Sequence, residues 1–547
     1  MTELLTSAQM RAVEAAAIAS EAVTGLELME RAGAGVVAAV MEEWPALAAG
    51  SHRAAVLCGP GNNGGDGFVV ARLLKGLGWT VEVFVYGDAG RLPPDARVTC
   101  ARWSAMGEVR QLEGERFAGL PWDHMDLVVD ALFGTGLSRP VDGAAAQVLA
   151  DVAAWQGLGE GHRVAVDVPT GLCADSGRVL AAQGSTPARF RADLTVTFHR
   201  AKIGHVLEVG PALCGRLVVK DIGLAGAGAG AVGLVGVDPD RLRKAGGHKF
   251  DHGHALILSG PAGRGGAARL AARGALRIGA GLVTVACPPD AVAEHAARLD
   301  AVMLREVADA AALAAVLADG RITALCLGPG MGLGARESGL VGVALGVAAA
   351  DNPWRGEPRP TDAGGEDAGP LEGVGRGLPR RALVLDADAL TLIARDAVLF
   401  DALHEGCVLT PHAGEFARLF PDLAAKLAAP AATGPACSKV DAARAAAKRA
   451  GCVVLFKGPD TVIAAPDGRC AINSADYDRA APWLATAGAG DVLGGVICGL
   501  LARGFAPFEA ACTGAWLHVD CARSFGPGLI AEDLPEEVPK VFRALGL

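Results

Sequence analysis

The residues best suited to chemistry lie near the C-terminus, where Ala487 to Asp491 reads Ala-Gly-Ala-Gly-Asp before an apolar, helix-like run that ends at Leu501. Glycines let several backbone N–H groups crowd around an anion, and the start of a helix adds a field that favours phosphate. The carboxylate that follows can take the proton of an attacking hydroxyl. The segment therefore indicates phosphoryl transfer with Asp491 as general base, and a plain helix-capping turn is the alternative.

A second loop, from Cys58 to Gly67, reads Cys-Gly-Pro-Gly-Asn-Asn-Gly-Gly-Asp-Gly between a strand-like run and a helix-like run. Loops at the carboxyl ends of parallel strands are where open α/β sheets bind ligands. Two amides and one carboxylate in this turn offer oxygen ligands, which favours a hard cation beside a phosphate-bearing ligand. The alternative is a tight turn in which Asn and Asp adopt left-handed conformations.

Two further apolar runs end in a carboxylate, at Asp130 and at Asp167. Glycine and threonine follow each of them, in Phe133-Gly134-Thr135-Gly136 and in Pro169-Thr170-Gly171. Burial and neighbouring charges can make one such carboxylate a base and leave the other as an ion ligand. Three polar strand ends on one face of a sheet therefore predict a site.

The composition is that of a globular enzyme. The 547 residues suffice for roughly two to four domains, with 51% hydrophobic and 20% charged residues. A net charge of -10 without a long basic run argues against nucleic acid or an anionic membrane as the main partner. The thirteen cysteines form no C-x-x-C pair and are expected to be reduced. With no signal-like N-terminus and no membrane-length apolar run, the sequence predicts a cytoplasmic protein.

Alternating strand-like and helical runs predict two α/β halves, each with a doubly wound sheet. Thr6 with Gln9 indicates a capping box at the start of an N-terminal helix. The Ala-Gly run 225–233 predicts a linker between domains 1–224 and 234–547, and 351–379 reads as an inserted low-complexity loop. The expected strands are 54–58, 81–86, 127–132, 164–168, 194–198 and 217–219 in the first half, and 255–259, 282–286, 322–327, 382–385, 407–409 and 453–456 in the second.

These motifs carry a family resemblance over nearly the whole chain. The first half resembles the NAD(P)H-hydrate epimerases through QMRAVEAAAIA, LMERAG, GPGNNGGDGFVVARLL, DALFGTGL and VDVPTGL. The second half resembles ADP-dependent NAD(P)H-hydrate dehydratases of the ribokinase-like superfamily, through GGAARLAARGALRIGAGLVTV, LGPGMG, LDADAL, TPHAGE, FKGPDT and TAGAGDVLGGVICG. The resemblance implies a Rossmann-like N-terminal domain and a ribokinase-like α/β/α sandwich.

What the resemblance implies is repair of nicotinamide nucleotides. Water adds to the reduced nicotinamide ring and gives R and S hydrates. The first half would interconvert them, and the second would restore NADH or NADPH from the S hydrate while ADP becomes AMP and phosphate. Phosphorylating the hydroxyl turns a poor leaving group into a good one, which explains why a kinase-like fold would carry out a dehydration.

The resemblance also implies site residues in the first half. Asp167 is the substrate contact and the expected proton-transfer residue. Lys202 is a weaker candidate for a role in the site, and the alternative is that it is only a surface cation. Glu14 stands where many relatives are expected to carry Asp, so its role is open. A potassium ion is implied at Asn63, Asp130 and Thr170. The implied hydrate contacts are Asn62, Asn63, Gly64, Gly65, Asp66, Gly134, Thr135, Gly136, Leu137, Ser138, Arg139 and Pro140.

In the second half Asp491 is the implied catalytic residue, and magnesium is expected to accompany ADP. Asp386 and Asp388 could position that magnesium or simply end a strand. The implied hydrate contacts are Ala267, Gly330 and His412, although His412 could be a satisfied strand-end histidine. The implied nucleotide contacts are Lys457, Gly458, Pro459, Asp460, Thr461 and Gly490.

Two alternatives and several questions stay open at this stage. An ordinary small-molecule kinase would use the same Gly-Ala-Gly-Asp turn, and the first half could be a binding module without catalysis. The residues do not decide between ADP and ATP, between NADH and NADPH hydrates, or whether substrate passes between the sites. The resemblance suggests a homo-oligomer, a tetramer or larger.

Overall fold

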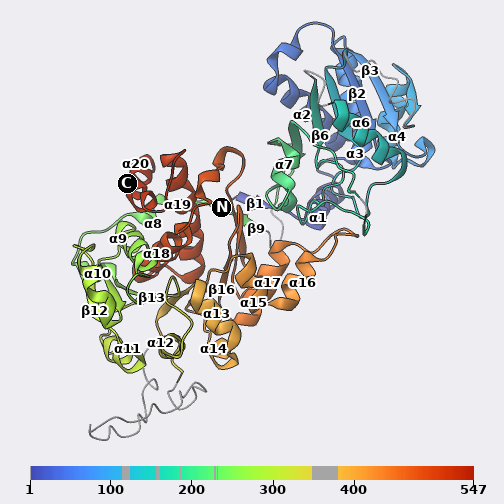
Figure 1. Cartoon of the computed structure of the whole chain (residues 1–547). Helices are drawn as coiled ribbons and strands as arrows, with labels where there is room; N and C mark the ends of the chain where they lie inside the picture. The colour runs from blue at the N-terminus through green and yellow to red at the C-terminus, as the bar shows by residue number, and fades with distance from the viewer. Residues whose placement is uncertain are drawn as a thin grey trace, which may run out of the picture. The chain divides into compact units, whose positions relative to one another are not determined.

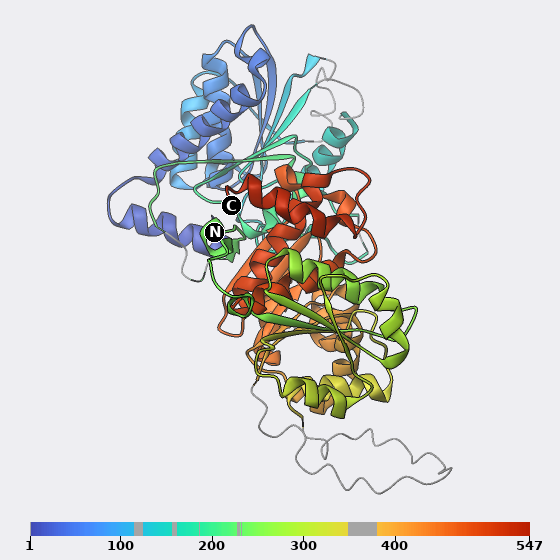
Figure 2. The same cartoon turned by 90° about the vertical axis from the view of Figure 1, so that its left-hand side faces the viewer.

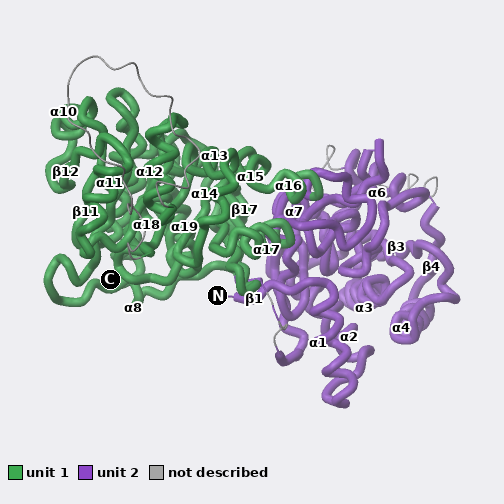
Figure 3. Tube along the Cα trace, turned by 90° about the horizontal axis from the view of Figure 1, so that it is seen from below, with its two compact units in different colours: residues 1, 234–426, 440–547 green, residues 2–233, 427–439 purple. Residues whose placement is uncertain are grey.

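The computed structural model describes residues 2–113, 124–155, 161–184, 186–226, 230, 232–347 and 380–547. Within these ranges the chain forms two compact units, coloured separately in Figure 3. The N-terminal unit comprises 2–233 and 427–439, and the C-terminal unit comprises 234–426 and 440–547. The predicted insertion 351–379 and part of the predicted linker lie outside the described residues. The predicted domain boundaries stay a prediction.

The N-terminal unit is built on a seven-stranded sheet of order β4-β3-β2-β5-β6-β7-β8, in which every neighbouring pair is parallel (Figure 1). Separate apolar clusters fill its two faces, one beneath α2 and α3 and the other beneath α6. The predicted doubly wound sheet is confirmed for this half. The elements are β2 (Arg53–Cys58), β3 (Thr80–Val85), β4 (Val109–Gln111), β5 (Leu127–Ala131), β6 (His162–Val166), β7 (Leu194–Phe198) and β8 (Arg216–Lys220), with α2 (Gly25–Glu43), α3 (Asn62–Gly76), α4 (Pro94–Ser104), α6 (Gly143–Trp155) and α7 (Gly210–Cys214).

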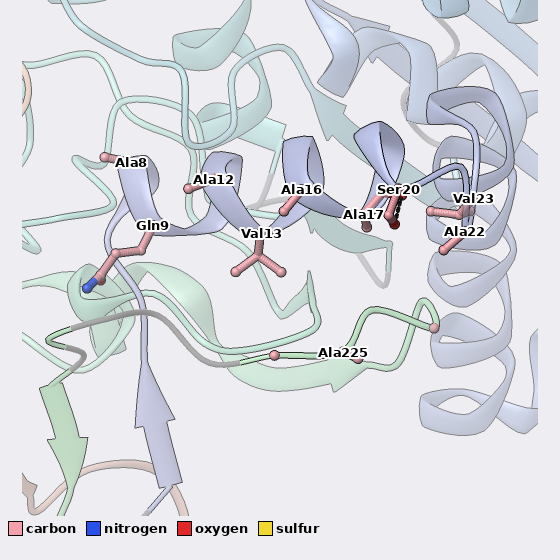
Figure 4. A pocket seen from close by; sticks show the side chains of 12 residues that line it. Ala8, Gln9, Ala12, Val13, Ala16, Ala17, Ser20, Ala22, Val23 and Ala225 are labelled. Atoms are coloured by element: carbon pink, nitrogen blue, oxygen red, sulfur yellow. Dashed lines mark hydrogen bonds between the residues drawn. The ribbon is translucent and has the colours of Figure 1, made fainter.

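Helix α1 (Ser7–Ala19) follows the short strand β1 (Thr2–Leu4) and begins with the predicted capping box. The Thr6 Oγ1 accepts from the Gln9 backbone N–H at 3.1 Å, and the Gln9 Oε1 accepts from the Thr6 N–H at 2.8 Å. One side of α1 carries Ala8, Ala12, Val13, Ala16 and Ala17 and lines an apolar pocket of about 660 Å³ (Figure 4). Another side, with Met10, Arg11, Glu14 and Ile18, faces a different and more polar pocket.

The predicted loop from Cys58 to Gly67 is shorter than expected, because α3 already begins at Asn62. Only Gly59 to Gly61 separate β2 from the helix. A Cβ at Gly59 would lie 1.7 Å from the Leu132 carbonyl oxygen, and one at Gly64 would lie 2.0 Å from the Gly59 oxygen. Glycine at these two positions lets the backbone turn into the helix at once.

The second sheet has eleven strands in the order β1-β9-β18-β17-β16-β15-β14-β13-β10-β11-β12. Strands β10 to β16 pair in parallel, whereas β17 pairs antiparallel with both β16 and β18. The predicted α/β sheet of the second half is confirmed, and at this edge it also contains antiparallel strands. Only Lys457 to Pro459 join β16 to β17, and so short a connection cannot cross over to make a parallel pair. The strands are β9 (Val232–Leu234), β10 (His254–Leu258), β11 (Leu282–Cys287), β12 (Met303–Glu306), β13 (Ala324–Leu327), β14 (Ala382–Leu385), β15 (Cys407–Leu409), β16 (Val453–Phe456), β17 (Asp460–Ala464) and β18 (Cys470–Ser474).

Helices cover this sheet (Figure 2). Among them, α18 packs on β10, β13 and β14. Helix α18 also lies unusually close to α9, because a Cβ at Gly495 would come within 2.0 Å of the Ala271 carbonyl oxygen and one at Gly499 within 2.4 Å of Ile278. No helix among the described residues is long and apolar enough to span a bilayer. The helices are α8 (Pro239–Leu242), α9 (Gly266–Arg277), α10 (Val292–Ala296), α11 (Ala310–Leu317), α12 (Ala335–Leu345), α13 (Ala387–Arg395), α14 (Ala397–Asp401), α15 (Ala413–Leu419), α16 (Pro421–Ala428), α17 (Lys439–Ala450), α18 (Ala489–Ala502), α19 (Pro507–Phe525) and α20 (Asp533–Ala544).

Candidate active sites

The N-terminal unit holds a pocket of about 560 Å³ at the carboxyl ends of its parallel strands. This is the edge at which open α/β sheets bind ligands. The loops after β2, β5 and β6 all contribute residues to the lining of this pocket. The prediction that three polar strand ends lie on one face of the sheet is confirmed for these lining residues. Its polar lining includes Glu14, Asn62, Asn63, Asp66, Thr135, Asp167 and Lys202.

Asp167 and Lys202 form a buried ion pair on the wall of this pocket. The Lys202 Nζ donates to the Asp167 Oδ1 at 2.7 Å and to the Thr197 Oγ1 at 2.7 Å, and the Thr197 hydroxyl donates to the same carboxylate oxygen at 2.9 Å. Burial raises the pKa of Asp167, but the Lys202 charge and hydrogen bond outweigh it and leave the pKa below its usual value. Lys202 is only 1% exposed, so its interpretation as a surface cation is wrong.

His205 fixes the backbone on both sides of this pair, and sequence reasoning missed it. Its Nε2 lies 3.0 Å from the Asp167 carbonyl oxygen, and its Nδ1 accepts from the Lys202 N–H at 3.0 Å. Burial, followed by the Lys202 charge, lowers the pKa of His205 to about 4. The imidazole is therefore neutral and carries its proton on Nε2. Asp167 has a φ of 65°, a conformation that a non-glycine residue keeps only where the surroundings impose it. The spacing Lys202-x-x-His205 was the available signal.

Three further carboxyl groups, Glu14, Asp66 and Asp95, line the same pocket. Burial raises the pKa of Asp66 well above its usual range, and the charges of Asp167 and Glu14 raise it further. Burial, and then the charge of Asp167, also raises the pKa of Glu14. The pocket thus combines Asp167, whose pKa is lowered, with Asp66 and Glu14, whose pKa values are raised. Carboxyl groups whose pKa values are pushed apart in this way can serve as a base and an acid.

Asp130 and Thr170 lie together behind this pocket. The Thr170 hydroxyl and N–H donate to the Asp130 carboxylate at 2.7 and 2.8 Å. Burial raises the pKa of Asp130 to about 6 despite these bonds. The Nδ2 of the nearby Asn63 is buried without a hydrogen-bond partner. Among the described residues no group of three or more His, Cys, Asp or Glu side chains could hold a metal ion, so oxygen ligands for a cation here would include amide, hydroxyl or backbone oxygens.

In the C-terminal unit, Asp491 lies in the first turn of α18, behind Gly488, which has a φ of 87°. A Cβ at Gly490 would lie 3.7 Å from the Lys457 Nζ, so the glycine turn and this lysine face the same space. Burial, followed by the charge of Asp386, raises the pKa of Asp491 to about 6, while Lys457 opposes the rise. The structure therefore brings together the predicted base and the predicted phosphate-binding groups.

Asp386, which the sequence left as either a magnesium-positioning residue or the end of a strand, pairs with Lys457. It is 2% exposed, and its Oδ1 accepts from the Lys457 Nζ at 2.7 Å. The Glu415 carboxylate lies 3.8 Å from the same nitrogen. Burial tends to lower the pKa of Lys457, but the charge and hydrogen bond of Asp386 raise it overall. Lys457 is therefore a positioned ammonium. The available signal was an aspartate at the end of β14.

The remaining predicted residues of this site fall into three groups. Ala267 and Gly330 are adjacent, since a Cβ at Gly330 would lie 3.5 Å from that of Ala267. His412 caps α15 through its Nδ1, which accepts from the Gly414 N–H at 3.0 Å, and its side chain remains 56% exposed. The Thr461 hydroxyl donates to the Gly458 carbonyl at 2.6 Å. The Nδ1 of His412 is thus used to cap the helix, while much of the imidazole ring stays accessible to a ligand.

His518 on α19 supports the glycine turn from behind. Its Nε2 lies 2.8 Å from the Ala489 carbonyl oxygen, and burial lowers its pKa to about 4, so the neutral ring donates this bond. A buried donor on the first carbonyl of α18 fixes the direction in which the helix begins. Sequence reasoning missed this residue, and no local motif marks it.

Two α/β units, each with a lysine–aspartate pair at the carboxyl end of parallel strands, define a two-site enzyme. The family model described as YjeF-related protein N-terminus matches residues 25–204, and that of NAD(P)H-hydrate dehydratase matches residues 255–350 and 376–539. The chain belongs to the family of bifunctional NAD(P)H-hydrate repair enzymes, as the resemblance of its motifs predicted.

The family assignment rests on relatives that match almost from end to end. The bifunctional NAD(P)H-hydrate repair enzyme of Moorella thermoacetica is 34% identical over 99% of this chain and 97% of its own. The enzyme of the same description from Escherichia coli is 31% identical over 93% of this chain and 88% of its own. The NAD(P)H-hydrate epimerase of Roseobacter litoralis is 47% identical over 41% of this chain and 100% of its own.

Proposed function

We propose that the N-terminal unit interconverts the R and S hydrates of NADH and NADPH, and that the C-terminal unit dehydrates the S hydrate while ADP becomes AMP and phosphate. The observation that carries this proposal is the match to the Moorella thermoacetica enzyme along 99% of the chain. One member of each lysine–aspartate pair takes part in the reaction proposed for its unit, Asp167 in the first and Lys457 in the second.

The epimerisation requires a bond to the hydroxyl-bearing carbon to break and form again. This carbon also bears the ring nitrogen, so removal of the hydroxyl proton can open the ring to an aldehyde, with the C–N electron pair passing to nitrogen. In this proposal the ionised Asp167 takes the hydroxyl proton and Asp66 protonates the ring nitrogen. Rotation about the adjacent C–C bond and the reverse steps then give the other epimer.

The dehydration begins with attack of the same hydroxyl on the β-phosphoryl group of ADP. Asp491 takes the hydroxyl proton, Lys457 neutralises charge on the transferred group, and the turn from Gly488 to Gly490 binds its oxygens. AMP leaves, and a phosphate ester replaces the hydroxyl. The ring nitrogen then pushes phosphate out, and loss of a proton from the neighbouring carbon restores the dihydronicotinamide.

Two cations belong to the proposal. Asn63, Asp130 and Thr170 offer a hard oxygen donor set for potassium. The unpartnered Asn63 Nδ2 is a hydrogen-bond donor and would suit an oxygen atom of the hydrate. Bound there, potassium would offset negative charge beside the hydrate. Magnesium is expected to accompany ADP, but Asp386 and Glu415 both face Lys457. We therefore assign magnesium to the nucleotide and not to a protein ligand.

The other predicted contacts complete the proposed sites. Helix α3 and the loop after β5 would hold the hydrate in the first site, and Ala267, Gly330 and His412 would do so in the second. Lys457 to Thr461, with Gly490, would line the nucleotide. We also propose a cytoplasmic homo-oligomer, and the burial of most of the cysteines as core residues agrees with thiols that stay reduced.

The proposal is tested by the recovery of dihydronicotinamide absorbance from a mixture of R and S hydrates, with ADP, with ATP or with neither. Complete recovery that depends on ADP supports both activities. Recovery of the S fraction alone would mean that the N-terminal unit has no epimerase activity and is a binding module. A stable phosphorylated product without recovery would make the C-terminal unit an ordinary kinase.

The pH dependence of the dehydration follows from Asp491. Its pKa of about 6 means that the base is ionised above this pH and protonated below it. We expect kcat/KM for the S hydrate to fall about tenfold per pH unit below about pH 6 and to level off above it. The measurement uses pure S hydrate with saturating ADP, corrected for the reaction without enzyme. A rate independent of pH through this range would contradict Asp491 as the base.

A further inference from the structure

The N-terminal unit contains a segment that the second half of the sequence contributes. Residues 427–439, which connect α16 to α17, group with 2–233 in the compact unit (Figure 3). Ala431 and Ala436 are buried in a small apolar cluster with Cys173 and Leu180, and Leu137 packs against it. The segment therefore lies on the surface of this unit and inserts two alanine side chains into its apolar interior.

Hydrogen bonds join this segment to two loops of the unit. The Gly434 N–H donates to the Ser138 carbonyl at 2.9 Å, and the Ala181 N–H donates to the Ala431 carbonyl at 3.0 Å. The Arg178 guanidinium donates to the carbonyls of Ala429 and Cys437. Backbone bonds of this kind, with an arginine holding both ends, fix a segment more firmly than apolar contact alone.

Both loops lead directly to the pocket. The loop after β5 lines the pocket with Gly134, Thr135 and Gly136 and touches the segment with its next two residues, Leu137 and Ser138. The Thr135 N–H donates to the Asp167 Oδ2 at 3.3 Å. The second loop is tied to the site because the Leu180 N–H donates to the Gly171 carbonyl at 2.9 Å, next to Thr170.

We propose that residues 429–437 act as a brace that positions the loop Gly134–Pro140 for hydrate binding, so that the epimerase pocket takes its shape partly from the second half of the chain. The inference rests on the proposed function of that loop. The brace touches the outer end of the loop and not Asp167 or Lys202, so it is a positioning element. Its loss is expected to weaken binding more than the chemical step.

Gly434 offers a sharp test. A Cβ at this position would lie 2.7 Å from the Leu137 carbonyl oxygen and 3.3 Å from the Ser138 Cα, so Gly434→Ala must push the loop away from the brace. We expect the KM of the epimerase for the R hydrate to rise by about threefold to tenfold, with a smaller change in kcat. This rise in KM is smaller than the roughly hundredfold loss of activity that a misplacement of about 1 Å can cause. Hydrogen–deuterium exchange of the peptide containing 134–140 should become faster.

Two more variants make the test decisive. Arg178→Gln removes the bonds to the two brace carbonyls without adding bulk, and we expect the same changes at smaller size. Thr433→Ala alters an exposed residue of the same segment and should change neither KM nor exchange. Dehydration of pure S hydrate reports that the C-terminal unit is folded, and a retained epimerase kcat reports the same for the N-terminal unit.

The possible results separate the brace from the proposed function. If Gly434→Ala and Arg178→Gln both keep the wild-type KM and the wild-type exchange of 134–140, the brace is wrong. If wild-type protein lacks epimerase activity but the exchange still quickens in the variants, the proposed function of the pocket fails while the brace stands. If Gly434→Ala loses both activities, Arg178→Gln decides the question.

Discussion

Asp491→Asn is expected to lower kcat for dehydration of the S hydrate by about a hundred- to ten-thousandfold, the usual contribution of a general base. The amide keeps the size of the side chain but cannot accept the hydroxyl proton. KM for ADP should change little, because Lys457 and the glycine turn remain. The measurement is the steady-state recovery of dihydronicotinamide absorbance from pure S hydrate.

The epimerase of the same variant provides an internal control. Conversion of the R hydrate to the S hydrate is measured by chromatography. It should proceed at the wild-type rate, because Asp491 belongs to the other unit. Asp422→Asn is the matched control for the substitution itself, since Asp422 is a surface partner of Arg449 and lies in the same unit. A retained dehydration rate in Asp491→Asn would remove this residue from the chemistry.

Asp167→Asn is expected to lower the epimerase kcat by a similar factor of about a hundred to ten thousand. In a mixture of both hydrates, recovery with ADP should then stop once the S fraction is consumed, apart from slow uncatalysed epimerisation. The dehydratase rate on pure S hydrate should be unchanged. This gives a direct reading of the epimerase defect in one assay.

The substitution also leaves the Lys202 ammonium buried without its counter-charge, which commonly costs about 3 to 5 kcal/mol. The double variant Asp167→Asn with Lys202→Met removes both charges and should recover much of that stability in thermal unfolding without recovering activity. Asp88→Asn, at an exposed position of the same unit and outside the pocket, is the matched control. Epimerase activity in the stable double variant would show that Asp167 is not the base.

The parts of the fold that sequence could predict are those set by local pattern. The parallel strands of the N-terminal unit, the Thr6–Gln9 capping box and the positions of Asp167 and Asp491 each follow from residues close together in the chain. The early start of α3 was missed because it depends on how closely Gly59 and Gly64 approach other backbone atoms. That distance leaves no periodic signal.

Long-range pairings account for the other misses. The ion pair between Asp386 and Lys457 joins positions 71 apart, and the bonds from Arg178 to the brace join positions 251 and 259 apart. The sequence around either residue of such a pair does not indicate which distant residue it contacts. Lys202 was underrated for the same reason, since only the fold reveals that it is buried against Asp167.

The contact between α9 and α18 has a consequence for how this protein can vary. Gly495 and Gly499 face the backbone and side chains of α9 at distances that exclude a methyl group, so any larger residue would shift α18 along with the turn that begins it. Neither glycine performs chemistry. In a library that samples every substitution, both positions should nevertheless tolerate as little change as Asp491. The positions of α18 that tolerate no substitution would then mark the helix face that packs against α9 and holds the glycine turn in place.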